Sequence, residues 1–191
     1  MSYDLKTFFS MNKQKIIIAA LSILIVILLI IAILLIFAFK NKTQEEKDLT
    51  KFLSPSKNVS LTLPDSLDMD IVTDRDYELL LNSIHDGNAI GISKTQKNPL
   101  YTFEQFINSD RETYISSFEN PKNVTDISSG TVNDIPYYKY SFNTNESYIE
   151  VYWIERNDAY YIIDFACDTK SGSSDLKGNI QEIMNSLTFN S

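Results

Sequence analysis

The chain has 191 residues, of which 43% are hydrophobic, 12% aromatic and 22% charged, and its formal net charge is −8. This length excludes (β/α)₈ barrels, which need about 250 residues, and the hydrophobic content excludes a fully disordered chain. A single cysteine, Cys167, and a single histidine, His85, exclude a disulfide framework, a cysteine-rich zinc site and a histidine-cluster metal site.

The charge is distributed unevenly along the chain. Residues 1–15 and 40–57 each carry a net charge of +2, whereas residues 58–191 carry nine basic and 21 acidic side chains, a net charge of −12. So acidic a domain repels nucleic acid and bare anionic lipid, and we therefore expect no nucleic-acid partner. Cationic partners, or partners that bring divalent ions, fit this charge better. The simpler interpretation is that the charge provides solubility alone.

The strongest pattern is an uncharged run of 24 residues, Ile16–Phe39, with 19 Ile, Leu, Val or Phe, four Ala and one Ser. At about 1.5 Å per residue, a helix of this length spans about 36 Å, enough to cross a hydrocarbon core of about 30 Å. A cleaved signal peptide has only about 7–15 apolar residues followed by small residues, and that pattern is absent here. We predict a tail at 1–15, one transmembrane helix at 16–39 and a linker at 40–57.

The orientation of this helix is less strongly marked by charge. Lysines lie on both sides of the run, at positions 6, 13 and 15 before it and at 40, 42, 47 and 51 after it. A short positive tail before a long apolar run is typical of a signal-anchor, and long domains translocate largely regardless of their charge. We therefore predict a cytoplasmic tail and an extracytoplasmic domain at 58–191. The alternative is a domain that faces the cytoplasm.

The first half of this domain reads as three strands and a helix. Residues 58–63 alternate apolar and polar side chains up to Pro64, which predicts a half-buried strand. Residues 77–84 and 89–93 flank a turn that contains Asp86-Gly87, a pair typical of hairpins. Thr102 and Gln105 form the pattern of a capping box, which predicts an amphipathic helix that ends before Pro121.

The second half reads as a meander followed by a helix. Strands are predicted at 125–132, 135–142, 148–156 and 160–168, and their short connections favour antiparallel neighbours. In the last strand Cys167 shares a face with Phe165 and Ile163, which indicates a small buried side chain rather than a nucleophile. A helix is predicted at 175–187. The expected fold class is α+β, an α/β/α sandwich around an antiparallel sheet.

Three segments of this domain resemble the PsbP/Mog1-like group, which includes bacterial DcrB-like lipoproteins. They are the opening strand that ends in Leu63-Pro64, the run Gly130–Phe142 with the sequence GTVNDIPYYKYSF, and the helix end Ile183–Phe189 with the sequence IMNSLTF. The resemblance covers nearly all of residues 58–191 and implies a sandwich around an antiparallel sheet. Relatives in that group bind proteins or ions and are mostly not enzymes, and the group offers no catalytic motif to transfer.

One acidic stretch is a candidate metal site. Six carboxylates fall within fourteen residues, and hard cations such as Ca²⁺ require several converging oxygen ligands. They are Asp65, Asp68, Asp70, Asp74, Asp76 and Glu78. Their spacing differs from that of an EF-hand. The simpler interpretation is a solvated strand edge that resists aggregation.

The sequence therefore predicts a non-catalytic binding or assembly module, single-pass in the cell membrane through Ile16–Phe39, with a protein partner at the cell surface. No catalytic or cofactor-binding residue is predicted. The alternatives are a hydrolase that uses carboxylates with a bound cation, and a cytoplasm-facing regulator tethered to the membrane.

Overall fold

The computed structural model describes residues 48–83, 85–169 and 175–190. The predicted tail at 1–15, the predicted membrane helix at 16–39 and residues 40–47 of the predicted linker lie outside these residues. In the described part, no helix is both long and apolar enough to cross a bilayer. Residues Asp48–Ser191 form one compact unit, to which all the described helices and strands belong.

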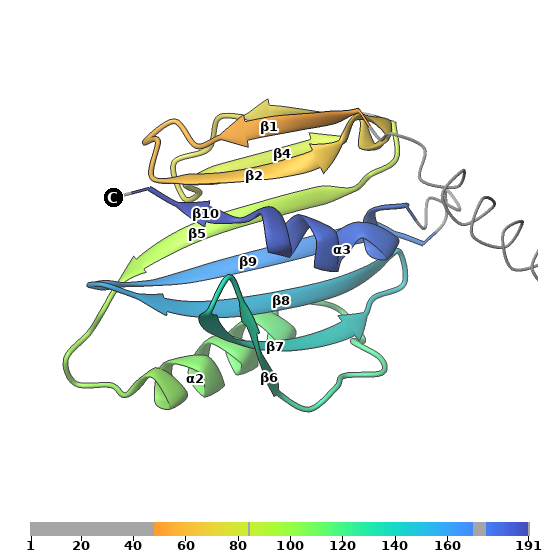
Figure 1. Cartoon of the computed structure of the whole chain (residues 1–191). Helices are drawn as coiled ribbons and strands as arrows, with labels where there is room; N and C mark the ends of the chain where they lie inside the picture. Colours follow the sequence, from red (N-terminus) through yellow and green to blue (C-terminus); the bar gives the residue numbers. More distant parts are fainter. Residues whose placement is uncertain (1–47, 84, 170–174, 191) are drawn as a thin grey trace, which may run out of the picture. The chain divides into compact units, whose positions relative to one another are not determined.

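The larger of two sheets has seven antiparallel strands in the order β3-β4-β5-β9-β8-β7-β6 (Figure 1). The strands are β3 (Met69–Val72), β4 (Leu79–Ser83), β5 (Ala89–Gln96), β6 (Ser128–Val132), β7 (Ile135–Asn143), β8 (Ser147–Arg156) and β9 (Ala159–Asp168). Strands β6 to β9 form the predicted meander. The predicted turn joins β4 to β5, and Gly87 has the positive φ of 66° that the Asp-Gly pair suggests.

The smaller sheet has three strands, β1 (Leu49–Leu53), β2 (Val59–Pro64) and β10 (Thr188–Phe189), with β2 in the middle. Strand β2 is the predicted opening strand. Strand β1 lies inside the range 40–57 that was predicted to be a linker, so the folded part begins earlier than expected. Four of the five β1 residues are exposed. This edge strand therefore lacks the alternation of buried and exposed side chains by which a half-buried strand is predicted from sequence.

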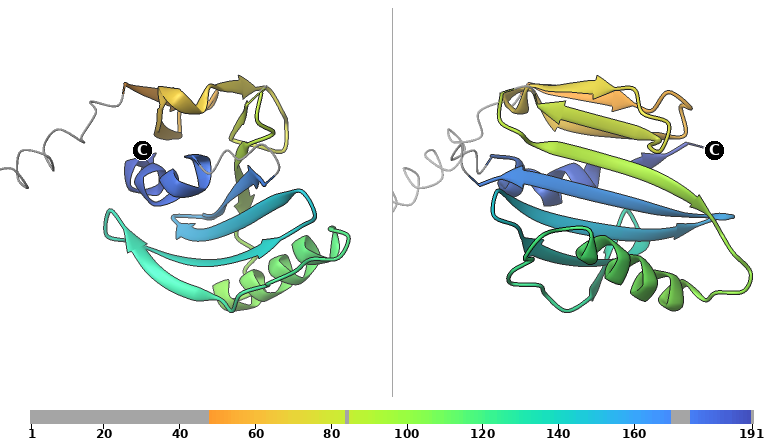
Figure 2. Two further views of the ribbon diagram at one scale, coloured as in Figure 1. Left: turned by 90° about the vertical axis from the view of Figure 1, so that its right-hand side faces the viewer. Right: turned by 180° about the vertical axis from the view of Figure 1, so that it is seen from behind.

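Two helices lie on opposite faces of the larger sheet, as Figure 2 shows. Helix α2 (Phe103–Ser116) begins with the predicted capping box, in which Gln105 N–H donates to Thr102 Oγ1 at 3.2 Å and Thr102 N–H donates to Gln105 Oε1 at 2.9 Å. Helix α3 (Asp175–Ser186) agrees with the predicted last helix. The expected α/β/α sandwich is modified, because the face that carries α3 also carries the three-stranded sheet.

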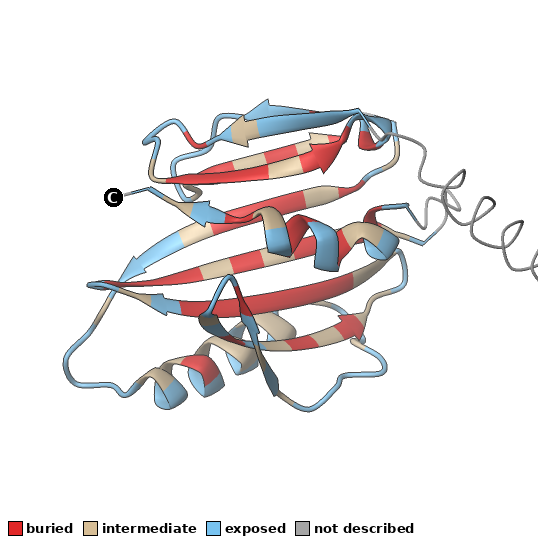
Figure 3. Cartoon of the chain, viewed as in Figure 1, coloured by how far each residue is buried: buried red, intermediate tan, exposed pale blue. Residues whose placement is uncertain are grey.

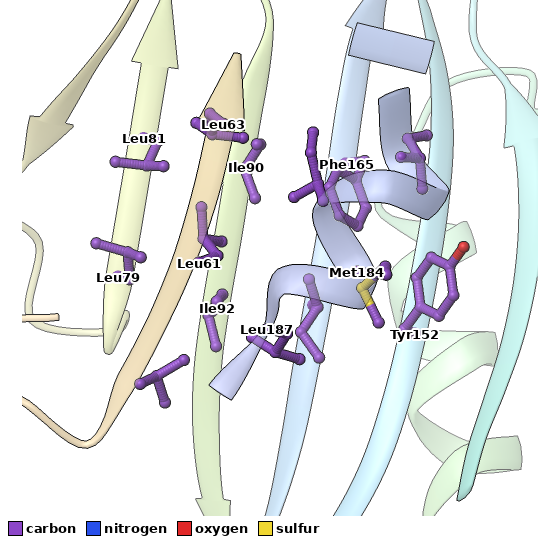
Figure 4. Close-up of a cluster of buried hydrophobic side chains, with 14 of the residues drawn as sticks. Leu61, Leu63, Leu79, Leu81, Ile90, Ile92, Tyr152, Phe165, Met184 and Leu187 are labelled. Carbon is purple, nitrogen blue, oxygen red and sulfur yellow. The ribbon is translucent and has the colours of Figure 1, made fainter. Parts of the chain in front are cut away.

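The core is divided between the two faces of the larger sheet (Figure 3). Side chains alternate along β8, so Val151 and Trp153 face α2 while Tyr152 and Ile154 face α3 and the smaller sheet. Figure 4 shows the core on the face that carries α3 and the smaller sheet, where leucines of β2 and β4 lie near isoleucines of β5, and Met184 of α3 lies near Phe165 and Tyr152. Cys167 lies in the same region, 2% exposed, and the prediction of a buried side chain is confirmed.

Candidate binding groove

The chain passes from the smaller sheet to the larger one over a short crossover between β2 and β3. Pro64 ends β2, since its ring nitrogen has no hydrogen to donate to a sheet ladder. A 3₁₀ turn, η1 (Asp65–Leu67), follows and buries Leu67. Asp68 then adopts the left-handed conformation with φ 44°, which Asp tolerates better than most residues. The crossover thus places two carboxylates directly before β3.

A surface cavity of about 370 Å³ lies beside this crossover. Both layers supply its lining, which consists of Thr50 and Phe52 of β1, Leu63 and Pro64 of β2, Asp65 and Asp68 of the crossover, and Met69 and Asp70 of β3. Leu63 and Met69 also belong to the core, so the floor of the cavity continues into the core. We call this cavity the β1–β3 groove. It combines an apolar floor with a carboxylate rim.

Hydrogen bonds attach the acidic rim to strand β1. The hydroxyl of Thr50 donates to Asp65 Oδ1 at 2.7 Å, and the Asp65 N–H donates to the Asp48 carbonyl at 2.9 Å. Asp68 Oδ2 lies 3.6 Å from Nε2 of His85, and the two side chains are 77% and 73% exposed. A contact so open to water adds little to stability. The rim is therefore held in position while its carboxylates stay accessible.

Both strands that border the β1–β3 groove are sheet edges. In the described part, β1 is hydrogen-bonded only to β2, and β3 only to β4. Each carries exposed apolar side chains, with Leu49 and Leu53 on β1 at 54% and 39%, and Ile71 and Val72 on β3 at 48% and 38%. Ile71 lies on the same face of β3 as the buried Met69, because side chains alternate along a strand. On β1, Leu49 and Leu53 lie on the face opposite to that of the groove-lining Thr50 and Phe52, so the apolar surface of the groove extends along β3 alone.

The structure separates the six acidic residues singled out in the sequence. Asp65, Asp68 and Asp70 line the β1–β3 groove, whereas the other three lie in the loop between β3 and β4. The Asp76 N–H donates to Asp74 Oδ1 at 2.9 Å, and Glu78 accepts a hydrogen bond from the Ser56 hydroxyl.

The six carboxylates do not converge on a common point. Among the described residues, no three acidic, histidine or cysteine side chains are grouped so that they could hold a metal ion. The predicted hairpin turn places His85 on the surface, where it contacts Asp68 of the crossover. Calcium binding by the acidic stretch stays a prediction.

Polar groups that the sequence did not single out lie beneath helix α2. Trp153 Nε1 donates to Asp110 Oδ2 at 2.7 Å, and burial raises the pKa of Asp110. Burial also raises the pKa of Asp164 in β9 to about 6, and the charge of Asp110 adds to this shift. Asp164 lies over Gly91 of β5 together with the ring of Tyr77. The only sign in the sequence that Asp164 is unusual is that a charged residue stands in the middle of a largely apolar strand.

A second polar network lies on the opposite face, between β7 and β8. Glu150 is 8% exposed and accepts hydrogen bonds from Lys139 Nζ at 2.7 Å, from the Tyr152 hydroxyl at 2.6 Å and from the Tyr148 hydroxyl. Burial alone would raise the pKa of Glu150, but these three donors outweigh it and hold that pKa below its usual value. Burial raises the pKa of the nearby Cys167 thiol to about 12, so the thiol stays protonated.

The comparison with protein-family models gives no match, and no curated protein matches the chain. Solved structures do match. The solution structure of cyanobacterial PsbP (CyanoP) from Synechocystis sp. PCC 6803 is similar to this chain with a TM-score of 0.56 at 7% identity, over 75% of this chain and 94% of that one. The fold is PsbP-like. At this identity the similarity concerns the fold alone, and it agrees with the fold that the sequence resemblance implied.

Two further solved structures are similar to the PsbP-like domain. One is a protein from Bacteroides thetaiotaomicron VPI-5482, with a TM-score of 0.47 and 15% identity, of which the match covers 48%. The other is a protein of unknown function, PA94, described as a putative regulator, from Pseudomonas aeruginosa, with a TM-score of 0.48 and 12% identity over 98% of its length. They cover 74% and 75% of this chain.

Proposed function

We propose that this protein is a membrane-anchored, extracytoplasmic module that binds or assembles with a protein partner at the cell surface and carries out no catalysis. The PsbP-like fold supports a binding role over an enzymatic one. The observation that carries the proposal is the β1–β3 groove, where an apolar floor and a carboxylate rim meet two open sheet edges. Surfaces of this mixed kind are typical of sites where proteins dock.

The anchor in this proposal is the apolar run Ile16–Phe39. Its charge-free length supports insertion into a bilayer, and the short lysine-containing tail before it supports an outward-facing domain. Protease treatment of intact cells tests the orientation. We expect the domain to be digested from outside, and digestion only after the membrane is opened would favour the cytoplasm-facing alternative.

Site-specific photo-crosslinking in the native membrane tests the binding role. A photoreactive amino acid replaces Thr50 or Ile71 at the groove in the full-length chain, and Glu112 on the exposed side of α2 serves as the matched control. We expect a discrete crosslinked protein from both groove positions and none from position 112. Crosslinks that are absent, or equal at all three positions, would contradict a binding function at the groove.

A further inference from the structure

Among the described strands, β3 has a partner on one side only, and its other edge is suited to accept another strand. Strand β3 lies at one end of the seven-stranded sheet. Three consecutive residues of its four, Asp70, Ile71 and Val72, are exposed to solvent. Natural sheets usually protect an open edge with charges, bulges or covering segments. Here a single charge stands beside two exposed β-branched side chains. Peptides commonly bind to such an edge by extending the sheet, with main-chain hydrogen bonds for affinity and pockets for alternate side chains.

The β1–β3 groove beside this edge supplies a pocket of suitable size and character. Its volume of about 370 Å³ falls at the small end of the range of about 300–1,000 Å³ that ligand pockets occupy. The floor consists of Phe52, Leu63 and Met69, and an apolar side chain placed on it would continue the core. A segment paired with β3 would direct alternate side chains towards this floor.

The charge around the groove determines whether the other side chains of a bound segment should be basic or acidic. Asp65, Asp68 and Asp70 are exposed and form its rim, and none of the described residues that line the groove is basic. The charge of residues 58–191 is −12, so the surroundings reinforce the same sign. Lysine or arginine next to the apolar anchor would be attracted to this rim, whereas an acidic segment would be repelled.

We propose that the β1–β3 groove binds an extended basic segment of a partner protein, which adds to the edge of β3, places a large apolar side chain on the floor and sets its cationic side chains against the rim. This inference rests on the proposed binding function and names the chemistry of the partner.

The test uses the full-length chain in a neutral detergent and a synthetic peptide of alternating lysine and valine with a central leucine. Hydrogen–deuterium exchange reports strand addition directly, and we expect the peptide to slow exchange at the amides of Met69–Val72. A peptide with glutamate for lysine should not bind. A peptide with proline at its centre should bind at least about tenfold more weakly, because proline removes a ladder donor.

Two triple variants separate the groove from general charge attraction. D65N/D68N/D70N neutralises the rim, and E104Q/E112Q/E119Q removes the same charge from exposed positions on and after α2. At low salt we expect the first to weaken peptide binding by at least about tenfold and the second to leave it within about twofold. Circular dichroism and melting temperature show that both variants are folded.

The inference is overturned by peptide binding that is undetectable at about 1 mM, that is equally sensitive to both triple variants, or that slows exchange at β1 or elsewhere instead of β3. These outcomes differ from a failure of the proposed function. Photo-crosslinking from Thr50 and Ile71 can still capture a partner when the basic peptide does not bind, which would leave the binding role intact and reject only the partner's chemistry.

Discussion

The indole nitrogen of Trp153 donates a hydrogen bond of 2.7 Å to the carboxylate of Asp110, and this bond ties helix α2 to strand β8. Trp153 is fully buried, and removal of the Asp110 carboxylate takes away the acceptor of its N–H. We expect D110A to lower the free energy of unfolding by about 1–3 kcal/mol, and D110N to lower it less because an amide oxygen can accept the bond. Urea unfolding measures both, and equal stability of D110A and wild type would refute this role.

The half-buried carboxyl of Asp164 predicts a stability that falls as pH rises. Its pKa is raised to about 6 in the folded chain, against about 3.9 for an unperturbed aspartate. The folded state therefore binds the proton more tightly, and stability is lost between about pH 4 and pH 6 by up to about 3 kcal/mol.

The D164N variant isolates this effect. Above about pH 6 we expect it to be more stable than wild type, with a smaller fall in stability between about pH 4 and pH 6. Urea midpoints across this range measure the difference. D126N removes a negative charge from an exposed position and controls for net charge. Curves for D164N and wild type that stay parallel across the range would contradict the prediction.

The close packing around position 91 is predicted to require glycine, because a side chain there would meet Tyr77 and Asp164. A Cβ at this position would lie 2.6 Å from Cε1 of Tyr77 and 2.7 Å from Oδ1 of Asp164. We expect G91A to lower the free energy of unfolding by about 1–3 kcal/mol because the site is overpacked. A matched control is G178A on α3, where a Cβ meets nothing within 4 Å.

The control substitution G178A should change the free energy of unfolding in the opposite direction. Alanine at position 178 should stabilise the chain by up to about 1 kcal/mol, since glycine is unfavourable inside a helix. Thermal melts of the two variants give the comparison. If both substitutions shift the melting temperature in the same direction, the close approach at position 91 has no energetic consequence.

The network around Glu150 predicts a strong dependence on its cationic partner. We expect K139M to lower the free energy of unfolding by about 3–5 kcal/mol, because it leaves a nearly buried carboxylate without its counter-charge. The pKa of Glu150 is lowered in the folded state, so its contribution is present near neutral pH and is lost as pH falls through the folded pKa.

A double-mutant cycle tests this coupling. E150Q keeps the shape of the side chain and removes the charge, and K139M/E150Q should cost less than the sum of the two single variants. Denaturant unfolding near neutral pH supplies the four free energies. Strict additivity would mean that the ion pair at 2.7 Å does not stabilise the fold.

Local patterns were sufficient to predict most of the larger sheet. Strands β7, β8 and β9 have alternating or continuous apolar residues and short connections, and α2 begins at a capping box, so the residues themselves indicate these elements. Strand β3 was missed because its four residues sit within an acidic stretch, and only pairing with β4 makes them a strand. Strand β10 has two residues, too few to show any period.

The candidate site was only partly predictable for a similar reason. The sequence grouped six acidic residues by their closeness along the chain, but the groove takes three of them and combines them with Thr50 and Phe52 of β1. No local pattern relates position 50 to position 70, since the two strands belong to different sheets. The positions of Asp110 and Asp164 likewise depend on how α2 packs across the sheet.

The smaller sheet also determines how the domain would respond to mechanical force. Leu49 pairs with Pro64 at one end of β2, and Phe189 pairs with Val59 at the other. Tension between residues 48 and 190 would therefore pull along β2 in opposite directions and load the ladders on both of its sides in shear. The bonds within each ladder would have to break together rather than one after another, and the five residue pairs between β1 and β2 would resist more strongly than the two between β10 and β2.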